Sequence, residues 1–280
     1  MDTINLLNSL ADQTDKDFQI IVVDNASVEE DFSALGGSAP GGNNILLIRN
    51  EKNLGFSGGN NIGIKKALEN GSNWVVLINN DTVVESSFIG ALKAKLGGLE
   101  GIVGIPLAED GYTAYYGLIE WLKPTLRHGY NPLYSEYLRR NRSYYSIGAA
   151  MAIHENVFDE IGLLDEKYFL YFEDADFSLR AGRASVPINF IDEPKVQHKE
   201  VSKTNRKLGN PLLLRYHYRN ALYFNQKNGP WYIKILVWPW SFWIIKKQIF
   251  KIIFFYRRDE SLAILSGVFD FYKNKMGKIV

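Results

Sequence analysis

The sequence predicts an α/β fold in which a mostly parallel sheet is flanked by helices, and three short apolar runs lead to that prediction. The runs cover residues 19–24, 45–49 and 74–78, and polar residues follow each of them. Such runs are typical of buried parallel strands whose carboxyl ends face a site. A helix predicted at 58–68 separates the second run from the third, and this order is found in doubly wound sheets.

Further elements follow a loop-rich stretch at 109–145, in which aromatic and basic residues cluster without a clear period. Small residues predict a strand at 146–153, and a short helix is expected at 155–161. A charged helix at 174–183 and a strand at 187–191 complete the predicted α/β body.

The composition fits one large α/β domain with an appendage. The chain has 280 residues, of which 46% are hydrophobic and 22% are charged, and this length can bury a substantial core. It contains no cysteine, which excludes a disulfide framework, a thiolate zinc site and a cysteine nucleophile. Residues 1–10 lack the basic segment and apolar core of a signal peptide, so a cytoplasmic location is expected.

Charge divides the chain into two parts. No acidic residue lies between Glu200 and Asp259, whereas twelve of the 32 Lys and Arg residues do, which leaves 20 basic against 31 acidic residues elsewhere. We therefore expect a mildly acidic catalytic domain at 1–208 and a basic, aromatic, helical region at 209–280. No nucleic-acid partner is expected.

Aromatic residues gather in the basic region, with ten of them between Trp231 and Tyr256. Lysines and Pro239 interrupt every apolar run well short of the ~20 residues that a membrane span needs. Aromatic side chains favour the headgroup boundary and lysines favour anionic lipid. Residues 231–258 are therefore predicted to lie on the inner face of the cell membrane as an interfacial helix or hairpin. The alternative is a helical subdomain whose aromatic residues pack on the catalytic core.

Asp24 and Asn25 follow the first predicted strand, at the edge of an open α/β sheet where ligands bind. A carboxylate in this place can accept a hydrogen bond from a pyrimidine base or from a ribose hydroxyl. An ordinary turn or helix cap is the alternative, and the sequence leaves both open.

A glycine-rich loop at 53–61 leads into the first predicted helix. Glycines let backbone N–H groups approach a ligand, and a helix N-terminus favours negative charge, so a diphosphate or ribose can bind nearby. The loop matches neither the dinucleotide-binding pattern nor the P-loop pattern, and a structural turn is the alternative.

Asn79, Asn80 and Asp81 follow the third predicted strand. Carboxylate and amide oxygens at a strand end can hold Mg²⁺ or Mn²⁺ against a diphosphate, whose own oxygens complete the site. The alternative is an Asn-rich turn in which Asp81 caps the next helix.

Aromatic and apolar residues at 168–172 run directly into the acidic residues Glu173, Asp174 and Asp176. A carboxylate that opens a helix beside an apolar pocket can accept a proton from a hydroxyl group, which favours Asp174 as a general base. Acidic residues in a first helical turn are also favoured by the helix dipole, and Asp176 with Arg180 is an ordinary i,i+4 pair.

His198 follows the last predicted strand. A lone histidine is more often a surface or structural residue than a metal ligand. The other three histidines, His128, His154 and His217, have no supporting context in the sequence.

Taken in order, these segments resemble the family 2 glycosyltransferases of GT-A fold, and in particular the branch that contains rhamnosyltransferases. The resembling pieces are SLADQTDKDFQIIVVDNAS, NLGFSGGNNIGI, VVLINNDTVVE and IGAAMAIHENVFDEIGLLDEKYFLYFEDADFSLR, followed by His198 at a family-like distance. The resemblance runs across nearly the whole chain. It implies a Rossmann-like GT-A sheet and inverting transfer of a sugar from a nucleotide-diphosphate donor to a cell-surface polysaccharide or lipid-linked glycan.

The resemblance also implies a role for each candidate residue. Asp174 is implied as the general base, with Glu173 and Arg180 holding its geometry. Nucleotide binding is implied for Asp24, Asn25, Asn53, Gly55, Gly58 and Asn80, and ligation of Mg²⁺ or Mn²⁺ for Asn79, Asp81 and His198. The implied partners are a dTDP- or UDP-sugar, with rhamnose suggested by the branch, and a glycan or polyprenyl-linked acceptor.

Two departures from the family pattern bear on these roles. Asn79 stands where the D-x-D metal motif commonly has its first Asp, which weakens metal binding in the absence of donor. Family members also open with a central strand of the type V-S-I-I-I-V-T-Y-N, and Met1 stands where the helix after that strand begins. Because losing a central strand leaves backbone groups unpaired, we expect either that the natural chain starts upstream or that this form is a poor enzyme.

Two other functions stay open at this point. A sugar nucleotidyltransferase shares the sheet topology and a metal at a strand end, but it uses an N-terminal glycine-rich loop with Arg or Lys that this chain lacks. A protein that binds glycan or organises an assembly complex without catalysis is the second alternative.

Overall fold

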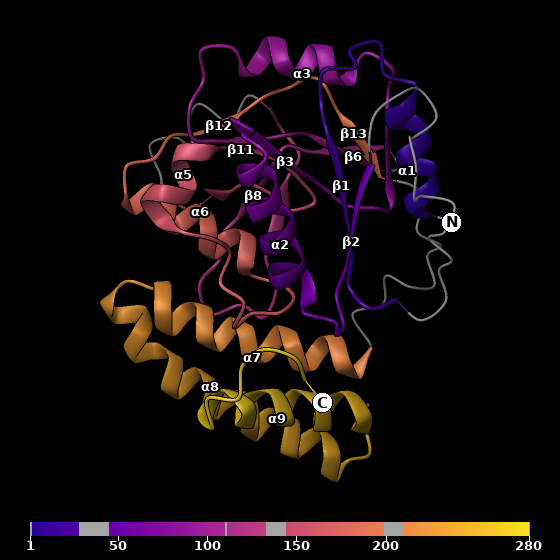
Figure 1. Cartoon of the computed structure of the whole chain (residues 1–280). Coiled ribbons are helices and arrows are strands. Elements are labelled where there is room, and N and C mark those ends of the chain that lie inside the picture. The colour runs from indigo at the N-terminus through magenta and orange to yellow at the C-terminus, as the bar shows by residue number, and fades with distance from the viewer. Residues whose placement is uncertain (1, 28–44, 110, 133–143, 199–209, 280) are drawn as a thin grey trace.

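A computed structural model describes residues 2–27, 45–109, 111–132, 144–198 and 210–279. Strands and their flanking helices form an α/β body, and three C-terminal helices lie together against one end of it (Figure 1). The two parts correspond in position to the predicted catalytic and C-terminal regions, although the boundary between them stays a prediction.

Helix α1 (Asp2–Ala11) is held to the body by its leucines and by the residue that follows it. Leu6, Leu7 and Leu10 recur on one face of the helix and are buried. The buried Gln13 amide donates hydrogen bonds to the carbonyls of Ser9 and Glu85, at 2.9 and 2.7 Å. This pairing fixes the end of α1 beside strand β4 (Thr82–Val84).

Strands β1 (Ile20–Asp24) and β2 (Ile45–Arg49) form a parallel pair, as predicted. Helix α2 (Gly55–Glu69) and strand β3 (Trp74–Ile78) follow, so the predicted order of strand, helix and strand is confirmed. The helix begins three residues before the predicted start, because the glycine-rich loop is part of its first turns.

A four-stranded sheet forms the middle of the body, in the order β12 (Ile188–Phe190), β5 (Ile102–Gly104), β11 (Ala150–His154) and β3. Strand β12 is parallel to β5, but β11 runs antiparallel to both of its neighbours. Three of the nine strand pairings in the described residues are parallel. The expectation of a mostly parallel sheet is therefore wrong, and the sheets are mixed.

Short strands fill part of the stretch that was predicted to be loop-rich. Strands β6 (Leu107–Glu109) and β7 (Tyr112–Ala114) pair with each other, and β13 (Val196–His198) joins β6 to β4. A separate three-stranded sheet has the order β10, β8, β9; these strands are β8 (Tyr116–Leu118), β9 (Arg127–Gly129) and β10 (Tyr144–Tyr145). Each of these strands has two or three residues, which is too short to show an alternating pattern.

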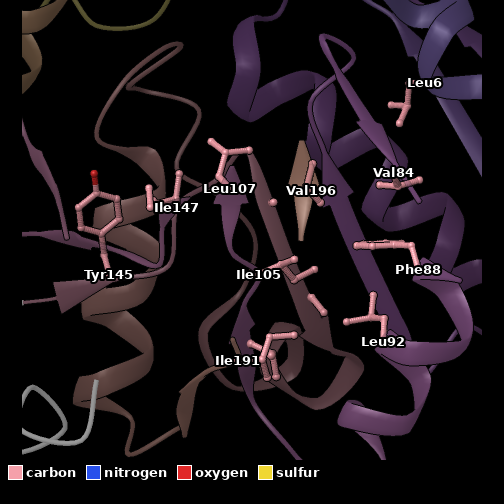
Figure 2. Packing of buried hydrophobic residues seen from close by; sticks show 14 of the residues in the cluster. Leu6, Val84, Phe88, Leu92, Ile105, Leu107, Tyr145, Ile147, Ile191 and Val196 are labelled. Atoms are coloured by element: carbon pink, nitrogen blue, oxygen red, sulfur yellow. The ribbon is translucent and has the colours of Figure 1, made fainter. Parts of the chain in front are cut away.

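The largest core lies between the sheets and helices α1 and α3 (Phe88–Leu96). Figure 2 shows Leu6, Val84, Phe88, Leu92, Ile105, Leu107, Ile191 and Val196 converging there, with Tyr145 and Ile147 at one side. Burial of this many apolar side chains supplies the main driving force for folding of the body.

Helices α5 (Glu155–Ile161) and α6 (Glu173–Arg183) form where they were predicted. Helix α6 carries acidic residues in its first turn and basic residues in its last turn, which suits the helix dipole. Arg180 donates to the Asp176 carboxylate at 2.9 Å and to the Leu163 carbonyl at 2.7 Å, so it ties α6 to the loop after α5. The predicted i,i+4 pair is therefore present, and it is buried on the Asp176 side.

The C-terminal helices are α7 (Pro211–Asn228), α8 (Trp231–Ile253) and α9 (Arg258–Tyr272). They share a small core of their own, which consists of Leu222, Val237, Ile244, Ile264 and Val268. A salt bridge of 2.6 Å between the Arg215 guanidinium and the Asp270 carboxylate also joins α7 to α9. In the part of the chain that the structure describes, no helix is both long and apolar enough to span a membrane.

Candidate functional site

The carboxylate of Asp24 lies at the carboxyl end of β1 and is almost fully buried. It accepts a hydrogen bond of 2.9 Å from the backbone N–H of Ser27. This contact is the turn cap that the sequence left open as an alternative, and it fixes the carboxylate at the edge of the sheet.

The side chain of Asn25 uses both of its ends to hold the loop before α2. Its amide nitrogen donates to the Gly55 carbonyl at 2.8 Å, and its oxygen accepts from the Leu54 N–H at 3.1 Å. The Asn50 side chain donates to the same oxygen at 3.0 Å. In the structure, Asn25 therefore positions the glycine-rich loop that was predicted to face the nucleotide.

Two glycines of this loop are required because neighbouring atoms leave no room for a side chain. Gly55 has a φ of +77°, and a Cβ added there would lie 2.3 Å from the Phe169 carbonyl oxygen. A Cβ added to Gly58 would lie 2.7 Å from the Cβ of Leu54. The Asn53 side chain accepts a hydrogen bond of 2.8 Å from the Gly55 N–H, which forms a local turn just before α2. The loop is consequently locked against residue 169.

Residues Asn79, Asn80 and Asp81 form a turn between β3 and β4. The Asn79 N–H donates to the Ala149 carbonyl at 3.0 Å, which joins the end of β3 to the turn that precedes β11. The exposed Asn80 side chain donates to the Thr3 hydroxyl at 3.1 Å and so contacts α1.

Strand pairing brings His198 to Asp81. Strand β13 pairs with β4 so that His198 lies opposite Thr82, next to the predicted metal ligand. The Nε2 atom of His198 is 3.2 Å from the Oδ2 atom of Asp81, and the imidazole is 12% exposed. Within the described ranges no group of three or more His, Cys, Asp or Glu side chains gathers as a ready-made metal site. Asp81 and His198 thus form a pair of adjacent oxygen and nitrogen donors.

The loop before α6 has an unusual backbone. Phe169, Tyr171 and Phe172 have φ values of 65°, 72° and 76°, in the left-handed region that side chains disfavour. Such residues persist where the surrounding structure holds them in place, and they cluster at functional sites. This loop delivers the chain directly into Glu173 and Asp174.

Side chains of α7 hold this loop from one side and the start of α2 holds it from the other. The Asn220 amide donates to the carbonyls of Tyr168 and Leu170 at 2.9 and 2.7 Å, and a third bond of 3.2 Å reaches the Tyr171 carbonyl. The Phe56 N–H donates to the Phe169 carbonyl at 2.7 Å. We call this set of contacts the loop clamp.

The carboxylate of Asp174 is held by two backbone donors. The Gly148 N–H donates to Oδ2 at 3.0 Å, and the Ala175 N–H donates to Oδ1 at 2.8 Å. Burial raises the pKa of Asp174 above its ordinary value, although both N–H donors favour the charged form. A fixed carboxylate with a raised pKa suits a group that accepts a proton.

Glu173 is a buried carboxylate beside Asp174. It is 5% exposed, and within the described residues its Oε2 atom has no hydrogen-bond partner. Burial raises the pKa of Glu173 well above its ordinary value, and the charge of Asp174 raises it further. The two acids therefore resist being ionised together.

His128 and Tyr145 complete the surroundings of the two acids, and sequence reasoning missed both. His128 interacts electrostatically with Asp174, while burial lowers its pKa. Tyr145 is buried, and burial together with the charges of Asp174 and Glu173 raises its pKa well above its ordinary value. His128 lies in β9 and Tyr145 in β10, within the stretch at 109–145 that has no clear hydrophobic period. The sequence therefore gave no signal that either residue lies near the two acids.

The candidate residues share one edge of the fold. Asp174 is bonded to Gly148, whereas Asn79 is bonded to Ala149, and neighbouring Cα atoms are about 3.8 Å apart. Asp81 follows Asn79 by two residues and contacts His198. The structure therefore brings the predicted base and the predicted metal ligands to the same strand ends.

The nucleotide candidates lie next to a cavity of about 1400 Å³. Asp24, Asn25, Gly55 and Asn80 line it, together with Asn79. Asn53 and Gly58 are absent from its lining. Asn53 makes a local turn bond to the Gly55 N–H, and Gly58 packs closely against Leu54.

Comparison with known proteins identifies relatives along most of the chain. The Shigella flexneri dTDP-rhamnosyl transferase RfbF is 25% identical over 66% of this chain and 63% of its own length. The Haloferax volcanii low-salt glycan biosynthesis hexosyltransferase Agl10 is 25% identical over 93% of this chain and 84% of its own. An N-acetylglucosaminyl-diphospho-decaprenol L-rhamnosyltransferase from Mycobacterium tuberculosis is 23% identical over 83% of this chain and 82% of its own.

Solved structures show the same fold. GalNAc-T7 with UDP, GalNAc and Mn²⁺ superposes with a TM-score of 0.61 at 18% identity, over 87% of this chain and 47% of that one. S. aureus TarS 1–349 with UDP-GlcNAc gives a TM-score of 0.53 at 12% identity, over 97% of this chain and 88% of that one. The GT-A fold implied by the sequence is confirmed in the form of a mixed α/β body with helices.

This chain spans 63% of RfbF and 47% of the GalNAc-T7 chain, so only part of each is represented. The profile of the family described as Glycosyl transferase family 2 matches residues 3–162, which is more than half of the chain. The resemblance read from the ordered motifs is thereby confirmed, and the chain belongs to glycosyl transferase family 2.

Proposed function

We propose that the protein is an inverting glycosyltransferase that moves a sugar from a nucleotide-diphosphate donor to a hydroxyl group of a cell-surface polysaccharide or lipid-linked glycan. The observation that carries the proposal is the Asp174 carboxylate, held by the Gly148 N–H beside the strand end that bears Asn79 and Asp81. Membership of glycosyl transferase family 2 supplies the class of reaction.

In the proposed reaction, Asp174 accepts the proton of the acceptor hydroxyl. At the same time, the oxygen of that hydroxyl forms a bond to the anomeric carbon of the donor sugar. The bond from that carbon to the diphosphate oxygen breaks, and the nucleoside diphosphate leaves from the opposite face. The N–H donors of Gly148 and Ala175 keep the carboxylate oriented. Burial raises the pKa of Asp174, so its carboxylate binds a proton more readily than a carboxylate in water does.

The relatives support a dTDP- or UDP-sugar as the donor. RfbF is named as a dTDP-rhamnosyl transferase, and the mycobacterial relative is named for rhamnosyl transfer to a diphospho-decaprenol glycolipid. UDP or UDP-GlcNAc is bound in the two structures of similar fold. We extend these to rhamnose or another hexose as the sugar here, and to a glycan or polyprenyl-linked acceptor.

Asp81 and His198 fit a divalent cation such as Mg²⁺ or Mn²⁺. Two ligands bonded to one such ion at about 2.1 Å and at right angles lie about 3 Å apart, close to the 3.2 Å between Oδ2 and Nε2. Two protein ligands leave positions for diphosphate oxygens, and Asn79, two residues before Asp81 in the chain, is the third ligand that we propose. A bound cation would supply positive charge for the leaving diphosphate.

Helix α8 supports contact with the inner face of a membrane. Its buried residues form one stripe, which consists of Ile233, Val237, Ser241, Ile244 and Gln248. Large apolar side chains also cover the remaining surface: Trp231, Trp238, Phe242, Trp243, Phe250 and Ile253 are each more than half exposed. Lys246 and Lys247 lie over the rings of Phe242 and Trp243, at 4.7 and 4.8 Å. This mixture suits anionic headgroups and the boundary beneath them.

Replacing Asp174 by Asn tests the proposed base. We expect transfer to fall by about 10²- to 10⁴-fold, since the amide cannot accept the proton, while UDP or dTDP binding changes little. Release of UDP or dTDP from a panel of UDP- and dTDP-sugars, together with calorimetric nucleotide binding, measures both quantities. The matched control is Asp159→Asn, at an exposed carboxylate on α5. Turnover in Asp174→Asn equal to that of the control would remove Asp174 from the mechanism.

Replacing His198 by Ala tests the proposed cation site. The affinity for UDP measured with Mn²⁺ is expected to fall by about 10- to 100-fold, whereas binding without metal stays the same. His154→Ala, which removes a histidine that caps α5, is the control. If both variants bind UDP and Mn²⁺ like the parent chain, His198 is not a ligand.

Replacing Trp243, Phe250 and Phe254 together by Glu tests the membrane proposal. These side chains are 55%, 62% and 64% exposed, so the change is expected to spare the fold. Sedimentation with liposomes that contain anionic phospholipid should be lost in this variant, because three apolar contacts become negative charges. Tyr112→Glu, on the exposed face of β7, should sediment like the parent. Equal sedimentation of the parent and the triple variant would refute membrane contact through α8.

A further inference from the structure

Two tyrosines form an exposed aromatic pair on the α/β body. Among the described residues before Asn210, Tyr112 and Tyr130 are the only exposed aromatic side chains, at 67% and 57%. Their rings contact each other, with centroids 5.8 Å apart and ring planes at 52°. Single exposed apolar side chains are normal on a protein surface, whereas a contiguous group of them indicates an interaction site. We call these two residues the tyrosine pair.

The tyrosine pair has a carboxylate beside it. Tyr112 is the first residue of β7, and its partner in the antiparallel pairing with β6 is Glu109. Directly opposed side chains of two paired strands share one face of the sheet, so the Glu109 carboxylate lies next to the Tyr112 ring. This place therefore combines aromatic surface with a strong acceptor of hydrogen bonds.

His128 connects the tyrosine pair to the candidate base. Tyr130 directly follows β9 and is two residues after His128, so in the extended chain the two side chains lie on the same face. The imidazole of His128 interacts electrostatically with the carboxylates of both Asp174 and Glu109. The pair and the candidate base thus lie on either side of this histidine.

Strand pairing gives the same placement. Gly117 of β8 pairs with His128 on one side and with β10 on the other, so this row of residues spans about 10 Å. Just past β10, the Ser146 N–H donates to the Ser178 hydroxyl at 3.0 Å, one turn of α6 after Asp174. The tyrosine pair is about 7 Å further along the chain of β9. It is therefore too far away for contact with a hydroxyl that reacts at Asp174, but within reach of a longer molecule bound there.

A sugar ring has the mixed surface that matches this place. One face of a pyranose ring presents C–H groups, and hydroxyl groups project from its edge. The C–H groups carry partial positive charge and are attracted to the negative face of an aromatic ring. The tyrosine hydroxyls and the Glu109 carboxylate can form hydrogen bonds with the sugar hydroxyls.

A nucleotide base and a lipid surface fit the tyrosine pair less well. The nucleotide candidates line the cavity beside β1 and α2, and neither tyrosine lines that cavity. Anionic headgroups attract basic side chains, whereas the charged group paired with Tyr112 is the acidic Glu109.

We propose that Tyr112 and Tyr130 bind, by stacking, a sugar of the acceptor glycan that lies beyond the sugar whose hydroxyl reacts. The inference rests on the proposed function, because its occupant is part of the proposed acceptor. The tyrosine pair makes no contact with the reacting atoms. Its effect is to favour acceptors of several sugars over a single sugar.

Glycan binding tests this proposal without any need for turnover. An array of immobilised single sugars and longer oligosaccharides, built from rhamnose, glucose, galactose and N-acetylglucosamine, is probed with the full chain in the absence of nucleotide sugar. We expect binding to longer oligosaccharides and not to single sugars. Tyr112→Ala and Tyr130→Ala should each weaken this binding about tenfold, because a stacked ring is lost. Both side chains are exposed, so the changes are expected to spare the fold.

Matched variants separate stacking from other effects. Tyr112→Phe and Tyr130→Phe keep the rings and should lose much less binding than the alanine variants. Tyr256→Ala removes a tyrosine of similar exposure, 60%, outside the α/β body and should bind like the parent. Equal binding by the parent and both alanine variants, or binding of no oligosaccharide by the parent, would overturn the proposal. Tyrosine-dependent binding without any release of UDP or dTDP from nucleotide sugars would support the sugar site and contradict the transfer reaction.

Discussion

The contact on which the candidate site depends is the hydrogen bonding of the Asn220 amide to the loop that precedes Glu173. That loop contains three left-handed residues, each of which costs free energy in an isolated chain. The amide bonds to the Tyr168, Leu170 and Tyr171 carbonyls hold the backbone in this shape, while the Phe56 N–H holds it from α2. The position of the acidic pair is a consequence of these bonds.

The loop clamp also connects the aromatic C-terminal helices to the site. Arg219, the neighbour of Asn220, is buried and donates to the Tyr168 carbonyl at 3.1 Å and to the Gly277 carbonyl at 2.8 Å. Burial lowers the pKa of Arg219 to about 10, so the guanidinium stays charged at neutral pH. These bonds tie α7 and the residues after α9 to the loop that leads into the acidic pair.

Local patterns in the sequence predicted the elements well where the pattern was long enough. The strand at 74–78 and the helix at 155–161 were predicted with the bounds that the structure has, because an apolar run and a short capped helix are local signals. The direction of β11 was not predictable, since antiparallel pairing with β3 is set by the path of the chain between them. The strands between 109 and 145 were missed because three residues are too few to show a period.

For the candidate site, the sequence predicted which residues gather and missed what holds them. Asp174, Asp81 and His198 were expected at one edge, and their contacts place them there, although their chemical roles stay predictions. Asn25 was expected to face a nucleotide, whereas its contacts hold the glycine-rich loop. The one weak sign of Asn220 in the sequence is a polar amide side chain among the aromatic residues of α7. Its hydrogen-bond partners could not be predicted, because they lie about fifty residues away in the chain.

The most direct test of this account is the turnover of Asn220→Ala compared with Asn210→Ala, which removes only the N-cap of α7. Losing the hydrogen bonds that the buried Asn220 amide donates to three carbonyls is expected to cost about 1–3 kcal/mol of stability. In Asn220→Ala, kcat should fall by at least about tenfold while the Kd for nucleotide is unchanged, because the acidic pair loses its orientation. The control should keep its kcat. A folded Asn220→Ala variant with the kcat of the parent chain would contradict the account.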